Sequence, residues 1–139
     1  MSYHHVDVDE LEPTPDRPSE QRSVSDVAGL EHVAVHRYDV APGEAIPLAY
    51  HYHDDQEEVF YVVEGELHVD TPEGEYVVGA DEAFVVEPAS PQYAHVPEDG
   101  VATRVVVVGA PSVDDVHPYE PDDADGDADD ADGDAEADG

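Results

Sequence analysis

The sequence predicts an all-β protein with one sandwich or barrel, an extended N-terminal segment and a disordered acidic tail. Three observations support this class. Short β-prone runs dominate the middle of the chain, turn signals separate them, and no long helical pattern lies between them. At 139 residues the chain suits a single domain.

Residues 1–32 are predicted to form an extended strap. This segment is rich in acid and proline, as in "ELEPTPDRPSEQRS". Pro13, Pro15 and Pro18 exclude a continuous helix, since proline lacks a backbone N–H and constrains the residue before it. One helical turn is expected near "SVSDVAGL".

Residues 33–118 are predicted to form the β-barrel. The turns between its strands include "APGE", "HDDQ", "TPEG" and "PEDG", which carry the residues that turns favour. The expected strands are "VAVHRYDV", "LAYHYH", "EVFYVV", "ELHV", "EYVV", "EAFVV" and "ATRVVVVG". Their valines and aromatic residues are sufficient to fill one core.

Residues 119–139 are predicted to be a disordered tail. From Pro121 onward the sequence is "PDDADGDADDADGDAEADG", with no aromatic or β-branched residue. Such a segment buries too little apolar surface to offset the entropy of ordering it. It contains no calcium-loop pattern, so we interpret it as a solvated charge run.

The formal net charge of −33 arises from 37 acidic residues and only four arginines. This charge predicts that neither nucleic acid nor a membrane surface is a partner. The tail holds ten of the acids, so 27 remain in residues 1–120 and the tail alone does not explain the charge. We interpret the excess as adaptation to a salt-rich cytoplasm, as in haloarchaea.

Cysteine is absent, which excludes disulfides and thiolate sites. There is no secretory leader pattern and no apolar stretch long enough to cross a bilayer. These features predict a soluble, cytoplasmic protein.

The stretch "HYHDDQEEVF", residues 51–60, carries the strongest chemical signal. His51 and His53 share one face of a strand, because side chains two apart point the same way. Glu57 and Glu58 are adjacent, so only one of them meets the histidines. Two imidazoles and a carboxylate converging in a barrel suit Fe(II), Mn(II), Ni(II), Cu(II) or Zn(II).

The segment from Gly43 to Gly65 resembles the first motif of the cupin superfamily. Its H-x-H pair, the following glutamate and the closing glycine are all present. Glu58 is followed by six residues and then Gly65, so the resemblance implies His51, His53 and Glu58 as metal ligands. It also implies a jelly-roll barrel, the double-stranded β-helix. The chain resembles the small single-domain cupins of haloarchaea.

A second cupin motif should supply a fourth ligand, and here it departs from the family. The matching stretch is "DEAFVVEPASPQYAHVPEDG", residues 81–100. The position of the expected histidine falls on Gln92 or Tyr93, and His95 lies slightly later. Gln92 and His95 are the two candidates for the fourth ligand. They face opposite ways on a strand, so at most one points inward without a bulge.

Three functional hypotheses follow. The first is a metal-dependent enzyme, dioxygenase-like or isomerase-like, acting on a small molecule. The second is a non-catalytic cupin that binds or senses a small ligand or metal. The third is a metal-free epimerase-like enzyme, in which His53 and Tyr93 transfer protons.

Two further expectations concern the cavity and the assembly. Phe60 and Val62 share the face of Glu58 and should line the cavity. The cavity has no obvious cationic clamp, since Arg37 and Arg104 are the only candidates within the β core. This argues against a polyanionic substrate unless one of the two points inward. By analogy with cupins, which pair through outer strands or an N-terminal strap, we expect a homodimer.

Overall fold

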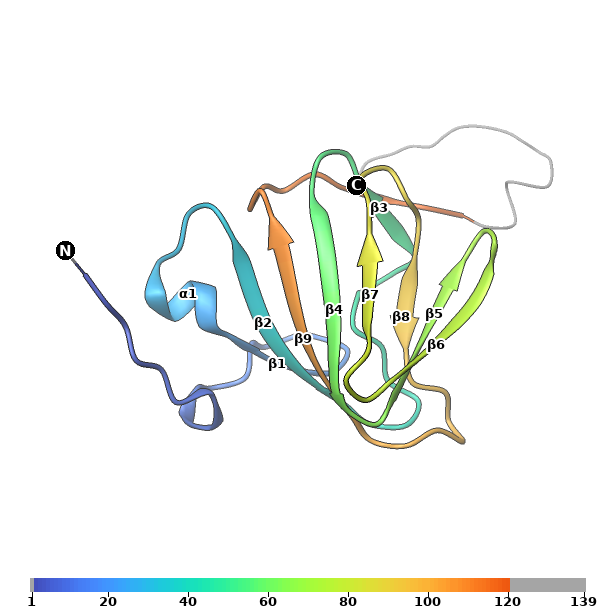
Figure 1. The fold of residues 1–139 in the computed structure, drawn as a ribbon, viewed down its shortest axis with the longest axis horizontal. Helices are drawn as coiled ribbons and strands as arrows, with labels where there is room; N and C mark the ends of the chain where they lie inside the picture. Colours follow the sequence, from blue (N-terminus) through green and yellow to red (C-terminus); the bar gives the residue numbers. More distant parts are fainter. Residues whose placement is uncertain (1, 121–139) are drawn as a thin grey trace.

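The computed structural model describes residues 2–120 and confirms the predicted all-β class (Figure 1). The part of the predicted tail from residue 121 onward lies outside the described residues. Within residues 2–120 there are ten strands and two short helices. The elements are η1 (Val8–Glu10), β1 (Glu20–Ser23), α1 (Val24–Ala28), β2 (Ala34–Val40), β3 (His51–His53), β4 (Glu57–Glu64), β5 (Glu66–Thr71), β6 (Gly74–Gly79), β7 (Ala83–Val86), β8 (Tyr93–His95), β9 (Thr103–Ala110) and β10 (Val116–Pro118).

Antiparallel sheets form the walls of the predicted jelly-roll barrel. One wall is five-stranded, in the order β1-β2-β9-β4-β7. The opposite wall combines a three-stranded sheet, β6-β5-β8, with the β10-β3 pair. Single bridges between Ala45 and His95 and between His51 and Gln92 connect these two parts. Figure 1 shows the walls spreading around a common interior, with β3 near the upper rim.

The N-terminal strap folds against its own barrel. Its β1 pairs with β2 at the edge of the larger sheet. The expected helical turn is α1, which begins where the Ser23 hydroxyl accepts a hydrogen bond from the backbone N–H of Asp26. It ends at Gly29, whose φ of 67° is left-handed. The division of the chain at residues 32 and 118 stays a prediction.

Valine-rich strands build the core by alternation. On β9, Val105 and Val107 are buried, whereas Arg104, Val106 and Val108 are only partly covered. Phe60 and Val62 on β4 meet them inside the barrel. None of the described helices has the length and hydropathy to traverse a bilayer. The predicted cytoplasmic location and salt adaptation stay predictions.

Candidate metal centre

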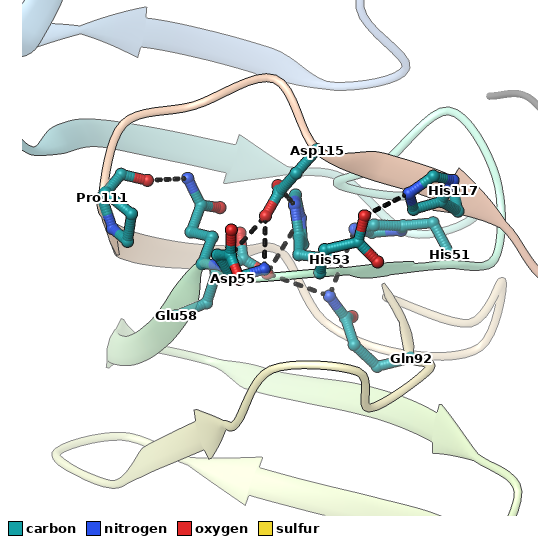
Figure 2. Close-up of polar contacts among 10 residues, drawn as sticks. His51, His53, Asp55, Glu58, Gln92, Pro111, Asp115 and His117 are labelled. Atoms are coloured by element: carbon teal, nitrogen blue, oxygen red, sulfur yellow. Dashed lines mark hydrogen bonds and ion pairs between the residues drawn. The ribbon is translucent and has the colours of Figure 1, made fainter.

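His51, His53 and Glu58 converge at one end of the barrel interior (Figure 2). The two histidines lie on β3, and Glu58 lies at the start of β4 after the turn between the strands. One potential ligand atom from each lies within 4.8 Å of the other two. Glu57 is exposed, as expected for the outward neighbour. The structure therefore brings together the three side chains that the sequence grouped.

The hydrogen bonds of the two imidazoles set their orientation. His51 Nδ1 lies 2.9 Å from the carbonyl oxygen of Ala49, and His53 Nδ1 lies 2.8 Å from Asp115 Oδ1. Both partners are acceptors, so each Nδ1 carries the proton and donates it. The Nε2 lone pairs of both rings are then available for a cation. His53 Nε2 lies 3.7 Å from Glu58 Oε1, so these two potential ligand atoms face the same small space.

Asp115 is a supporting residue that the sequence did not indicate. Its carboxylate also accepts hydrogen bonds from the backbone N–H groups of Asp55, at 2.6 Å, and Gln56, at 3.0 Å. Partial burial works to raise the pKa of Asp115, but these donors and His53 outweigh it and hold the pKa below its ordinary value. An ionised carboxylate on a histidine Nδ1–H fixes the ring and makes Nε2 a better ligand.

Gln92, directly before β8, approaches His51 and Glu58 from the opposite strand. It forms a two-hydrogen-bond bridge with His51, so the two side chains share one face. Its amide nitrogen lies 3.2 Å from Glu58 Oε1 and 3.4 Å from His51 Nε2. Its amide oxygen is buried and has no hydrogen-bond partner among the described residues.

This unpartnered oxygen bears on whether a cation fits. The two ends of an amide exchange places by a simple rotation. After rotation the oxygen of Gln92 would face His51 and Glu58, and would offer a lone pair to a cation. Two imidazoles, one carboxylate and one amide oxygen form a donor set that suits divalent transition metals.

His95 and Tyr93 do not reach this centre. His95 pairs with His68 across β8 and β5, and its Nε2 lies 3.2 Å from Asp70 Oδ2. Together with Glu75, these groups form a separate cluster on the outer side of the smaller sheet. Tyr93 stacks on His95 with ring centroids 5.4 Å apart. The alternatives that placed His95 as fourth ligand and Tyr93 as proton-transfer partner of His53 therefore do not match the geometry.

Burial shifts the pKa values of two residues at the centre. It is the main cause that raises the pKa of Glu58, against the opposing effects of His53 and the hydrogen bond from Gln92. Burial is also the main cause that lowers the pKa of His51. Both shifts disfavour charge on the groups. A divalent cation would favour the ionised carboxylate and the neutral imidazole at once.

The centre forms part of the wall of a cavity of about 440 Å³. Apolar side chains, including Ile46, Leu48, Phe60 and Val107, line much of it. The expected position of Phe60 is confirmed. Val62 is fully buried in the core and does not line the cavity.

Five polar residues that the sequence analysis did not place in the cavity also line it: Arg17, Gln21, His36, Tyr38 and Gln56. The expected cations Arg37 and Arg104 instead bind Asp9 and Asp39. Alternation on "VAVHRYDV" could have indicated His36 and Tyr38, since they share a face. Nothing local indicates Arg17, because the path of the strap brings it there.

Comparison with known proteins decides the family. A family model of the cupin domain matches residues 36–109, more than half of the chain. The protein belongs to the cupin family. No curated protein sequence matches the chain.

Solved cupin structures share the fold at low sequence identity. The polyketide cyclase RemF from Streptomyces resistomycificus has a TM-score of 0.69 and 20% identity, covering 83% of this chain and 84% of its own. A cupin sugar phosphate isomerase from Silicibacter pomeroyi has a TM-score of 0.64 and 21% identity, with coverages of 77% and 75%. A Streptomyces PAC13 variant with uridine has a TM-score of 0.67 and 16% identity, with coverages of 86% and 92%. At these identities the likeness concerns the fold.

Proposed function

We propose that this cupin binds one divalent transition metal ion and uses it to transform a small molecule in the barrel cavity. The ligands are His51, His53, Glu58 and the amide oxygen of Gln92. The observation that carries the proposal is the orientation of the imidazoles, since Ala49 and Asp115 engage both Nδ1 atoms and leave the Nε2 lone pairs for a cation. The unpartnered oxygen of Gln92 supports the fourth position.

The reaction class that the cavity favours is an isomerase-like proton transfer. A bound metal would supply Lewis-acid stabilisation of developing negative charge on the substrate. Burial lowers the pKa of His36, so its imidazole is neutral at pH 7 and able to accept a proton. Burial raises the pKa of Tyr38, so its phenol keeps a proton that it can donate. The names of the isomerase and cyclase relatives are consistent with small-molecule chemistry.

The first test is elemental analysis of protein purified without added metal. We expect one tightly bound transition metal ion per chain, or uptake of one ion from added Fe(II), Mn(II) or Ni(II). Proton transfer is then followed by NMR, as deuterium incorporation from D₂O into small sugars and organic acids. Protein that emerges free of metal and refuses all three ions would exclude the metal-dependent proposal.

A metal-free cupin that binds a small ligand is the second candidate. The amide nitrogen of Gln92 approaches both Glu58 and His51, and so gives these groups a partner in the absence of an ion. The PAC13 relative with uridine is consistent with small-ligand binding in this fold. Metal-free protein in which a small molecule still binds the cavity would favour this candidate.

Asp115→Asn tests the supporting carboxylate. We expect metal affinity to fall about 10- to 100-fold, because outer partners of ligating histidines typically contribute that much. The neighbouring substitution Asp114→Asn is the matched control. It also removes one acidic charge, but from an exposed side chain. A competition titration with a chromophoric zinc chelator measures both. Equal affinities in the two variants would contradict the role of Asp115.

The expected homodimer has support in the outer face of β4 and β7. Val59, Tyr61 and Val85 are exposed there by 38%, 41% and 62% despite the strongly acidic composition. We expect Val85→Asp to convert a dimer into a monomer in size-exclusion chromatography with light scattering. Val101→Asp, at a valine exposed by 54% in a loop, should leave the dimer intact. A monomeric wild type would remove the proposal.

A further inference from the structure

Arg17 differs from the other arginines in having no carboxylate partner among residues 2–120. The other three form short ion pairs: Arg22 with Glu20 at 2.7 Å, Arg37 with Asp9 at 2.9 Å, and Arg104 with Asp39 at 2.8 Å. The chain has 37 acidic residues, so acidic partners are abundant for any exposed cation. The unpaired state of Arg17 therefore reflects its position inside the fold.

The position of Arg17 is set by the strap. Its Nη2 donates a hydrogen bond of 2.9 Å to the carbonyl oxygen of Ile46, and its Nε is buried without a partner. The side chain lines the same cavity as the metal centre. His36 and His51 line this cavity together with Arg17.

A partly buried cation without a counter-ion is costly. Transfer of a charge from water into a protein interior is compensated when the charge is paired and hydrogen-bonded. Glu58 is the single carboxylate that lines the cavity among residues 2–120, and it forms no ion pair with Arg17. A guanidinium has five N–H donors in a planar fork that suits a carboxylate. An anionic ligand would supply the missing partner.

We propose that Arg17 binds the anionic group of the ligand, and that the ligand is a small organic acid. The other end of the ligand would lie toward His51, His53 and Glu58, and this part of the inference rests on the proposed function. Arg17 is the only lysine or arginine that lines the cavity in the described part of the chain, so it is the one side chain there whose fixed positive charge can pair with an anionic group. Ile46, Phe60 and Val107 offer an apolar surface to the body of the ligand.

The neighbouring polar groups fit this assignment. Gln21 Nε2 donates a 2.6 Å hydrogen bond to Tyr38 Oη, and both side chains line the cavity beside Arg17. The phenol oxygen already accepts this bond, so its O–H remains a donor for an acceptor in the cavity. Arg17 and Tyr38 thus present hydrogen-bond donors. These donors favour an anionic ligand over a neutral amide ligand.

Benzoate and benzamide form the test pair, since they have the same shape and differ in charge. Their binding is measured by isothermal titration calorimetry on the full chain, at the lowest salt that keeps the protein folded. We expect benzoate to bind wild type at least 10-fold more tightly than benzamide. Arg17→Gln should remove this preference, because glutamine keeps hydrogen-bond donors but has no charge. A charged hydrogen bond of this kind corresponds to roughly a 10- to 100-fold change.

Two further variants separate anion binding from attachment of the strap. Arg22→Gln removes another strap arginine, one that donates a 2.9 Å hydrogen bond to the carbonyl of Leu11 outside the cavity. It should keep the preference for benzoate, and Arg17→Lys should keep part of it. Equal binding of benzoate and benzamide to wild type, or an unchanged preference in Arg17→Gln, would overturn the assignment.

The metal content of the same samples distinguishes this inference from the proposed function. Wild type and Arg17→Gln are expected to hold equal amounts of metal, because Arg17 is not a ligand. Loss of the benzoate preference at constant metal content supports the role of Arg17. Metal-free wild type that still prefers benzoate through Arg17 would contradict the metal centre and support the anion site.

Discussion

His53→Ala is expected to lose the bound metal ion, with affinity reduced by more than about 100-fold. Removal of an outer partner of a ligating histidine already costs up to about that factor, so removal of the ligand itself costs more. His53 is also the ligand with the firmest support, through its 2.8 Å contact with Asp115. The variant leaves Glu58 buried without the imidazole whose Nε2 lies 3.7 Å from its Oε1.

His95→Ala is the matched control for this experiment. It removes an imidazole of similar exposure from the outer cluster with Asp70, without touching the barrel centre. The tightly bound ion should remain in this variant. Retention of the ion in His53→Ala together with loss in His95→Ala would overturn the assignment of the barrel centre and favour the outer cluster.

Thermal unfolding provides a second readout of the metal centre. A ligand at 100 times its dissociation constant stabilises the folded state by about 2.7 kcal/mol, which for a domain of this size raises Tm by about 10 °C. We expect this rise for wild type and His95→Ala after metal is added. His53→Ala should show almost none.

Gly65→Ala is expected to cause the largest loss of folding stability. Gly65 joins β4 to β5 at a φ of 92°, which side chains rarely adopt. An added Cβ would lie 2.6 Å from the carbonyl oxygen of Ala102 and 2.7 Å from Thr103 Cα. Both are backbone atoms, so relief requires movement of the loop before β9. Left-handed strain and overpacking together predict a loss of about 2–5 kcal/mol in the free energy of unfolding.

Gly29→Ala separates the two causes. Gly29 also has a positive φ, 67°, but no atom lies within 4 Å of the added Cβ. This control should lose only the conformational part, about 1–2 kcal/mol. Denaturant titration at constant salt gives both values. Equal losses would show that the close approach at Gly65 is relieved without cost.

Local periodicity accounts for much of what could be predicted. The alternation on β3 predicts that His51 and His53 share a face, and the same rule separates Glu57 from Glu58. Turn residues and short β-prone runs were sufficient for the all-β class. These features depend on neighbours along the chain, so one sequence reveals them.

The positions of the remaining site residues depend on contacts between distant parts of the chain. Gln92 faces the centre because it pairs with His51 across 41 positions of the chain, whereas His95 pairs with His68 and faces outward. Asp115 reaches His53 across 62 positions, and Arg17 contacts Ile46 across 29.

Contacts of this kind follow from strand register and from the path of the strap, which are set by packing of the whole barrel. Short-range patterns therefore indicated the three central residues of the candidate metal centre in "HYHDDQEEVF". The orientation of those side chains, the approach of Gln92 and the position of Arg17 in the cavity depend on residues that only the folded chain brings together.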